Sequence, residues 1–128
     1  MKFVDAKTET PNEYRQVMTV RSHTFAADYS ETDSAPGPHD LFDASLAACK
    51  SITAHWYAKR NNLPLERVET HIERDETDER KGVYRLTVHV ELFGDLLTEE
   101  QRAKIQAAIA HCPVHKLMTT TDAQITTV

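Results

Sequence analysis

The stretch PHDLFDASLAACKSITAHWYAKR, residues 38–60, decides the fold. Between Leu41 and Ala58 its only charged side chains are Asp43 and Lys50, and apolar or small residues occur on every face of a helix drawn through it. A helix that is apolar on all faces is a buried helix, and the proline that opens the stretch suits a first helical turn. The sequence therefore predicts a long buried helix with Cys49 near its middle.

Composition limits the class of protein. The chain has 128 residues, the usual size of one domain, so we expect a single domain over residues 1–128. With 15 Lys and Arg against 20 Asp and Glu, the net charge is -5, which argues against a nucleic-acid binder. The N-terminus has no apolar core typical of a signal peptide and no run is long enough for a membrane span, so we expect a cytoplasmic protein. In that reducing compartment, two cysteines indicate a transient catalytic disulfide more than a structural one.

The remaining pattern predicts an α+β fold. Two segments alternate apolar and polar residues and are joined by the charged run DETDERKG, which is typical of a β-hairpin. A region rich in Val, Thr and Phe predicts one or two further strands, and a loop rich in Ser, Asp, Pro and Gly follows it. The hairpin strands are expected at 66–74 and 83–93, the earlier strands within 14–28, the loop at 29–37, and a last strand at 123–128.

A second helix is expected to begin at Thr98, because TEEQ at 98–101 is a capping box. Apolar residues at helical spacing follow, and Pro113 ends the helix and starts a short one with Cys112 near its cap. A thiol at a helix N-terminus faces unpaired amides, which favour its thiolate. Cys112 is therefore a candidate reactive thiol, with a capping or core role as the alternative.

Cys49 receives no such help from its own helix, so a cation from elsewhere would have to activate it. Arg21 is a candidate, whereas Lys50 points about 100° around the helix from Cys49. Asp40 is expected in the first turn or the preceding loop, where an acid is also favourable by itself. Ser45, Thr53 and Trp56 share the Cys49 face, so two hydroxyls and an indole would surround the thiol, in a pocket or simply in the core.

Two other kinds of chemistry are weaker hypotheses. The run HCPVH places His111 and His115 around Cys112, but it lacks the ligand number and spacing of known zinc sites, so we expect no metal or other cofactor. A cysteine hydrolase would pair Cys49 with His55 or His115. His55 lies about 120° away on the same helix, and no fixed spacing supports either pair.

Three motifs occur in order along the chain: GPHDLFDASLAAC at 37–49, CKSITAHWYAKRNNLPL at 49–65 and CPVHKLM at 112–118. Together they resemble the osmotically inducible protein C and organic hydroperoxide resistance family of thiol peroxidases. GPHDLFDASLAAC at 37–49 resembles the start of that family's central helix, ending in its first cysteine. CKSITAHWYAKRNNLPL at 49–65 resembles the rest of the helix, and CPVHKLM at 112–118 resembles the second cysteine motif. The resemblance extends from about Arg21 to Val128.

This resemblance implies an intertwined homodimer in which antiparallel sheets wrap around the long central helices. It implies that Cys49 attacks an organic hydroperoxide and becomes sulfenic acid, and that Cys112 resolves it to a disulfide. A dithiol reductant, such as a lipoyl protein, or a small thiol would then reopen the disulfide. Arg21 and Asp40 match the family's Arg and Glu at the thiolate, with Asp40 one methylene shorter than Glu.

Three functions follow in order of preference. The first is a cofactor-free thiol peroxidase acting on organic hydroperoxides. The second is a non-catalytic or redox-sensing relative with weak or no peroxidase activity, suggested by the shorter acid at Asp40. The third is a cysteine hydrolase of small acyl substrates.

Overall fold

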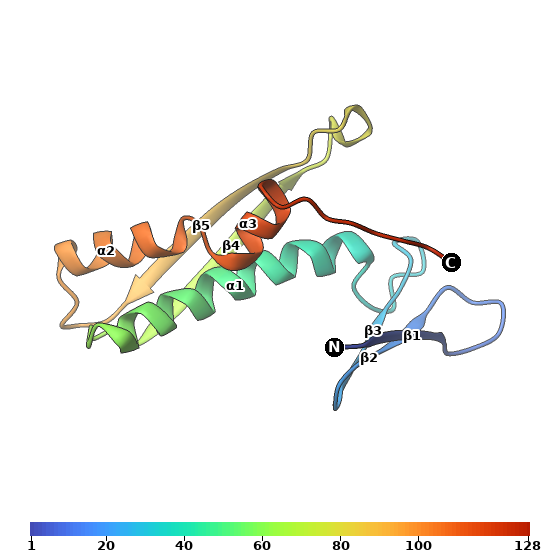
Figure 1. The fold of residues 1–128 in the computed structure, drawn as a ribbon, viewed down its shortest axis with the longest axis horizontal. Helices are drawn as coiled ribbons and strands as arrows, with labels where there is room; N and C mark the ends of the chain where they lie inside the picture. Colours follow the sequence, from blue (N-terminus) through green and yellow to red (C-terminus); the bar gives the residue numbers. More distant parts are fainter. The chain divides into compact units, whose positions relative to one another are not determined.

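Helix α1 (Pro38–Arg60) is the longest element of the structure, a computed structural model that describes all residues, 1–128 (Figure 1). The chain divides into two compact units, Met1–Phe42 and Asp43–Val128. Helix α1 begins at the end of the first unit and continues through the second. It ends where Asn62 adopts a left-handed conformation (φ 52°) and the Leu63 amide donates to the Ala58 carbonyl, a C-terminal cap that satisfies an otherwise unpaired carbonyl.

The first unit contains a three-stranded antiparallel sheet in the order β1-β2-β3. Its strands are β1 (Val4–Thr8), β2 (Gln16–Val20) and β3 (His23–Ala27). One or two strands were expected within 14–28, and the structure has two there, β2 and β3, whereas β1 was not predicted. Val20 pairs with His23, so Arg21 lies in the tight turn between these strands.

The loop after β3 is organised by Asp28, a buried carboxylate. One carboxylate oxygen accepts from the Tyr29 amide and the Thr32 hydroxyl, and the other accepts from the amide and hydroxyl of Ser34. These bonds hold the pKa of Asp28 far below its usual range, with the Ser34 hydroxyl making the largest contribution. The predicted loop at 29–37 is thus confirmed, and it is ordered by one acid.

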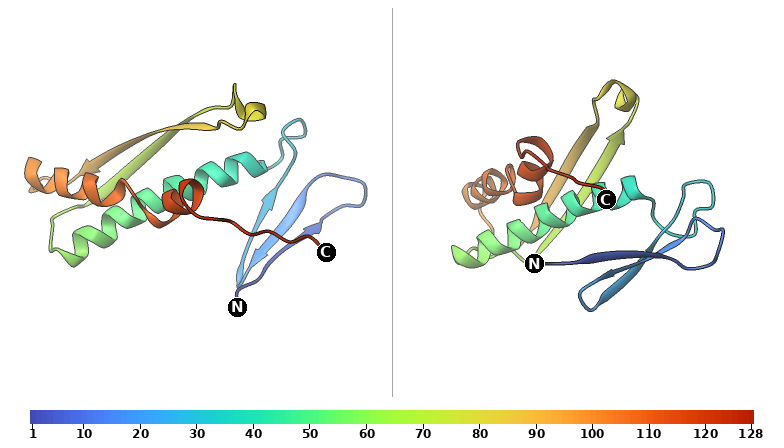
Figure 2. Two further views of the ribbon diagram at one scale, coloured as in Figure 1. Left: turned by 45° about the horizontal axis from the view of Figure 1, so that its top comes forward. Right: turned by 45° about the vertical axis from the view of Figure 1, so that its right-hand side comes forward.

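In the second unit, strands β4 (Arg67–Asp75) and β5 (Arg85–Phe93) form the expected hairpin, with Arg67 opposite Phe93. The charged connection includes a short 3-10 helix, η1 (Glu79–Lys81), which Gly82 ends in a left-handed conformation (φ 86°). One face of the hairpin is half-buried and contacts α1, where the Ser51 and Thr70 hydroxyls bond at 2.7 Å. The hairpin runs along the helix (Figure 2).

Two helices complete the second unit, α2 (Glu99–Ile109) and α3 (Pro113–Thr119). The capping box is confirmed: the Gln101 amide donates to the Thr98 hydroxyl at 3.2 Å, and the Thr98 amide donates to the Gln101 side chain at 3.0 Å. Pro113 is the first residue of α3 and Cys112 is its N-cap, as predicted. The chain thus enters α3 directly at the second cysteine.

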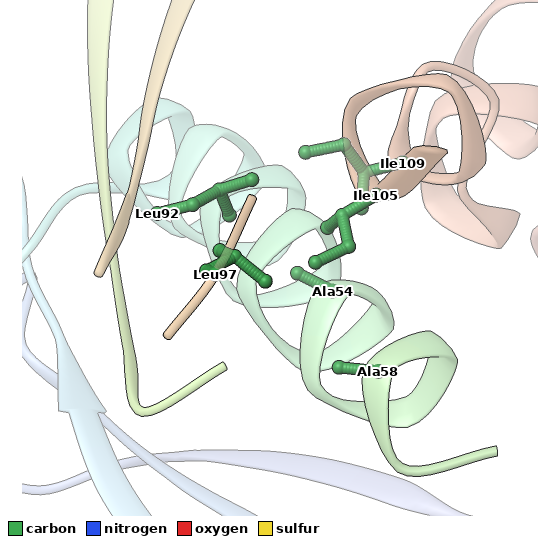
Figure 3. Packing of buried hydrophobic residues seen from close by; sticks show 6 residues of the cluster. All are labelled: Ala54, Ala58, Leu92, Leu97, Ile105 and Ile109. Carbon is green, nitrogen blue, oxygen red and sulfur yellow. The ribbon is translucent and has the colours of Figure 1, made fainter. Parts of the chain in front are cut away.

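The hydrophobic core lies where α1, β5 and α2 meet (Figure 3). The fully buried residues that helix α1 contributes to it are small alanines, and Ile105 of α2 is fully buried in the same cluster. Full burial of one such isoleucine stabilises the fold by about 1.5–3 kcal/mol. The cluster consists of Ala54, Ala58, Leu92, Leu97, Ile105 and Ile109.

Two expectations were wrong. Helix α1 is not buried on all faces: its buried side chains follow one stripe, whereas Ile52 is 66% and Trp56 58% exposed on another. The alternation of small and apolar residues all round the helix concealed this asymmetry, because only one side of α1 is covered by the hairpin and α2. Residues 123–128 form no strand, since no other strand pairs with their backbone.

None of the helices combines the length and the hydropathy that a membrane crossing requires.

Candidate functional site

Cys49 lies at the edge of the buried stripe of α1 and is partly exposed. The Val114 backbone amide, in the first turn of α3, points at its sulfur with an N···Sγ distance of 3.5 Å. The Thr53 hydroxyl lies 3.9 Å from the same sulfur, one helical turn further on. The predicted neighbour Thr53 is therefore in contact with the thiol, and the second cysteine motif supplies a further polar group.

Cys112 is almost completely buried, with 1% of its surface exposed. Burial raises the pKa of the Cys112 thiol, and the neighbouring Cys49 raises it further. The His115 amide and the charge of Lys50 act in the opposite direction, but burial is the largest effect. The expectation that the helix N-terminus makes Cys112 a readily ionised thiol was therefore wrong, because a seven-residue helix does not offset the loss of water around the sulfur.

Lys50 is the charged residue that the structure places between the two cysteine motifs. It is only 5% exposed, and its ammonium donates to the carbonyls of Ile109 (2.7 Å) and Ala110 (3.0 Å) at the end of α2. It also contacts Nδ1 of His115 at 2.9 Å. From the sequence, Lys50 was expected only as a possible cation for Cys49, and these contacts were not predicted. A lysine in an otherwise apolar helix is nevertheless a signal that a buried charge needs partners.

His115 is neutral near pH 7, because burial, Lys50 and His111 together lower its pKa below its usual value of 6.5. Its Nδ1 can then accept the Lys50 hydrogen bond as an uncharged ring nitrogen. The rings of His111 and His115 meet edge to face at 5.7 Å between centroids. His115, one of the two histidines of the hydrolase hypothesis, thus has its Nδ1 engaged by Lys50.

A second group missed from the sequence anchors the first turns of α1 within the second unit. Asp43, which is buried, accepts from Arg74 Nε at 2.7 Å and from the Tyr84 hydroxyl at 2.8 Å. Desolvation, followed by the bond to Asp43, raises the pKa of Tyr84 to about 12. This network fixes the end of the hairpin nearest its connecting turn, where Arg74 and Tyr84 lie, to the helix that carries Cys49.

Arg21 and Asp40 belong to the first unit. Arg21 is exposed in the β2–β3 turn and adopts a left-handed conformation, φ 56°. Asp40 accepts from the Gly37 amide at 2.8 Å at the beginning of α1, which is the local role of an acid in a first turn. Their action on Cys49 stays a prediction. Cys49 and Cys112 both belong to the second unit, and their side chains are neighbours.

Fold and site together define an α+β protein with two thiols on packed helices. The family model for OsmC-like proteins matches residues 31–128, so the chain belongs to the OsmC-like family. Among curated proteins, none matches this chain.

Solved structures with the same fold are distant in sequence. The OsmC-like protein of Mycoplasma pneumoniae is 16% identical with a TM-score of 0.75, covering 94% of this chain and 88% of its own. The organic hydroperoxide resistance protein OhrB of Bacillus subtilis is 20% identical with a TM-score of 0.61, covering 94% and 91%. A protein from Legionella pneumophila, described as an organic hydroperoxide resistance protein OsmC, is 18% identical with a TM-score of 0.62, covering 94% and 90%. The α+β, OsmC-like fold expected from the motifs is confirmed.

Proposed function

We propose that this protein is a thiol-dependent peroxidase that reduces organic hydroperoxides through Cys49 and Cys112. The observation that carries the proposal is the pair of free thiols on packed elements, one partly exposed and one buried. The chain belongs to the OsmC-like family, and solved structures with its fold include organic hydroperoxide resistance proteins. Both findings support the choice of substrate.

The exposures of the two cysteines suit different steps. Cys49 is the thiol that a hydroperoxide in solution can reach, so it is the attacking residue. Cys112, shielded from solvent, suits a partner that reacts with an oxidised neighbour and protects it from further oxidation. The Val114 amide beside the Cys49 sulfur adds a hydrogen-bond donor for negative charge there.

The chemistry balances in three steps. The Cys49 thiolate attacks the terminal peroxide oxygen, the O–O bond breaks, and the alkoxide leaves and takes a proton to become an alcohol. Cys112 then attacks the Cys49 sulfenic acid, forming the S–S bond and releasing water. A dithiol, such as a lipoyl protein, or a small thiol reduces the disulfide and is itself oxidised. No metal or cofactor takes part in this scheme.

We also propose that two copies of the whole chain, acting as one domain, assemble into a homodimer in the cytoplasm. The exposed stripe of α1, with Ile52 and Trp56, supports this part of the proposal. Large apolar side chains on a helix face are stabilised by cover from another surface. Trp56 lies on the same side of α1 as Cys49, so such cover would also shape an apolar approach to the thiol.

The test is turnover of cumene hydroperoxide and hydrogen peroxide by the purified protein with a dithiol reductant. We expect the organic substrate to be consumed faster, and we expect Cys49→Ser to abolish turnover. If the wild-type protein turns over neither peroxide, the proposal is wrong and the redox-sensing or non-catalytic interpretation replaces it. Ester or thioester hydrolysis that is lost in Cys49→Ser would instead support the hydrolase.

A further inference from the structure

The ammonium of Lys50 contacts the chain on both sides of Cys112. Its acceptors are the carbonyls of Ile109 and Ala110, just before the cysteine, and Nδ1 of His115, just after it. An ammonium has three N–H donors, and these three acceptors match them. Lys50 of α1 therefore binds the whole turn that connects α2 with α3.

These three contacts of the Lys50 ammonium are buried. At 5% exposure the charge is removed from water, and a buried ammonium is tolerated only where its donors are satisfied, as they are here. The two carbonyls lie at the C-terminal end of α2, where the helix dipole also favours a cation. Since Lys50 follows Cys49 directly in α1, its contacts fix the α2–α3 turn, which contains Cys112, to the helical turn that carries Cys49.

We propose that Lys50 is a positioning residue for the second thiol, which holds Cys112 against Cys49 and brings a fixed positive charge to the step that closes the disulfide. The proposal rests on the thiol peroxidase function proposed above. Lys50 then acts in the step that forms the disulfide, through Cys112, and not by contact with the peroxide.

The charge matters because the attacking form of Cys112 is its thiolate. In this step the Cys112 thiolate Sγ bonds to Cys49 Sγ and the S–O bond of the sulfenic acid breaks. The hydroxide leaves and takes up the proton that Cys112 released on ionising, so water is formed. Burial and Cys49 disfavour the Cys112 thiolate, whereas Lys50 favours it. His115 is neutral near pH 7, and His111 is exposed, so Lys50 is the cation buried beside Cys112.

The first test compares Lys50→Met with wild type after one equivalent of cumene hydroperoxide, trapping sulfenic acid and disulfide at successive times. Lys59→Met, an exposed lysine of the same helix, is the matched control. We expect disulfide formation to slow by roughly tenfold, the effect of losing a nearby opposite charge, and to slow more than Cys49 oxidation does. Unchanged disulfide formation in Lys50→Met would overturn the proposal.

A second test does not depend on peroxide. The ultraviolet absorbance of the thiolate is titrated in Cys49→Ser and in Cys49→Ser/Lys50→Met, where Cys112 is the remaining thiol. We expect the Cys112 titration to move to higher pH without Lys50, and identical titrations would refute the electrostatic role. Lys50→Gln, which keeps N–H donors but not the charge, replaces Lys50→Met if that variant does not fold. If wild type consumes no hydroperoxide, the proposed function fails while this titration still decides the role of Lys50.

Discussion

The network around Asp43 gives a quantitative prediction for Tyr84→Phe. The substitution removes one hydroxyl, which donates to a buried carboxylate at 2.8 Å, and leaves the aromatic ring in place. A hydrogen bond to a charged group contributes about 1.5–3 kcal/mol. Because Arg74 still pairs with Asp43 at 2.7 Å, we expect the lower end of that range.

The expected loss of about 1.5 kcal/mol corresponds to a fall of roughly 6 °C in Tm for a chain of this size. Urea unfolding at fixed protein concentration measures it, and Tyr14→Phe, which removes the hydroxyl of a tyrosine in the first unit that is 64% exposed, is the matched control. A double-mutant cycle with Asp43→Ala, which removes both acceptor oxygens, isolates the bond, and we expect a coupling energy of about 1 kcal/mol or more. Zero coupling, or equal effects of the two Tyr→Phe changes, would refute the role given to Asp43.

Three further predictions follow from the same structure. Tyr84 has a raised pKa of about 12 against 10.0 for an ordinary tyrosine, so its contribution to stability is complete below pH 10 and is lost as pH rises toward 12. Tyr84→Phe should abolish this part of the alkaline loss of stability in urea unfolding, and an unchanged pH profile would contradict this prediction. In the reduced protein, iodoacetamide should label Cys49 at least about tenfold faster than Cys112, because Cys112 is buried and its pKa is raised. Mass spectrometry of the labelled peptides measures the two rates, and equal rates would contradict the roles assigned to the two cysteines. Thr98→Ala should lower the free energy of unfolding by about 1 kcal/mol by removing the capping box of α2, with the exposed Thr127→Ala in the C-terminal segment as the control. A loss no larger than that of the control would show that the cap is not needed.

The sequence predicted the features that depend on neighbours along the chain. The capping box at Thr98 and the helix start at Pro113 depend on residues within four positions of each other, and both were confirmed. The β4–β5 hairpin was equally visible, because strict alternation over nine residues has one structural explanation. The cysteine motifs placed Cys49 and Cys112 in one family pattern before any geometry was known.

Features that depend on partners distant in the chain were missed. Lys50 meets acceptors 59 to 65 positions away, and Asp43 meets donors 31 and 41 positions away. Nothing local specifies those partners, although both charges interrupt an apolar helix and so required some. The pKa of Cys112 was misjudged for the same reason, since its burial depends on how α1, α2 and α3 pack together.

The exposed stripe of α1 was concealed by composition. Apolar residues as a group occur all round this helix, so their pattern does not distinguish the side that packs in this chain from the side that carries Ile52 and Trp56. Residues 123–128 have the composition of a strand but no partner strand. In both cases the missing information is the presence or absence of a covering surface.

The most direct test of the central claim is the state of the two cysteines after one equivalent of cumene hydroperoxide. The reduced protein is treated, quenched with a thiol-blocking reagent, and mapped by peptide mass spectrometry. We expect a disulfide between Cys49 and Cys112 of the same chain, a trapped Cys49 sulfenic acid in Cys112→Ser, and no fast oxidation in Cys49→Ser. Cysteines that stay reduced in the wild-type protein, or fast oxidation that persists in Cys49→Ser, would contradict the central claim.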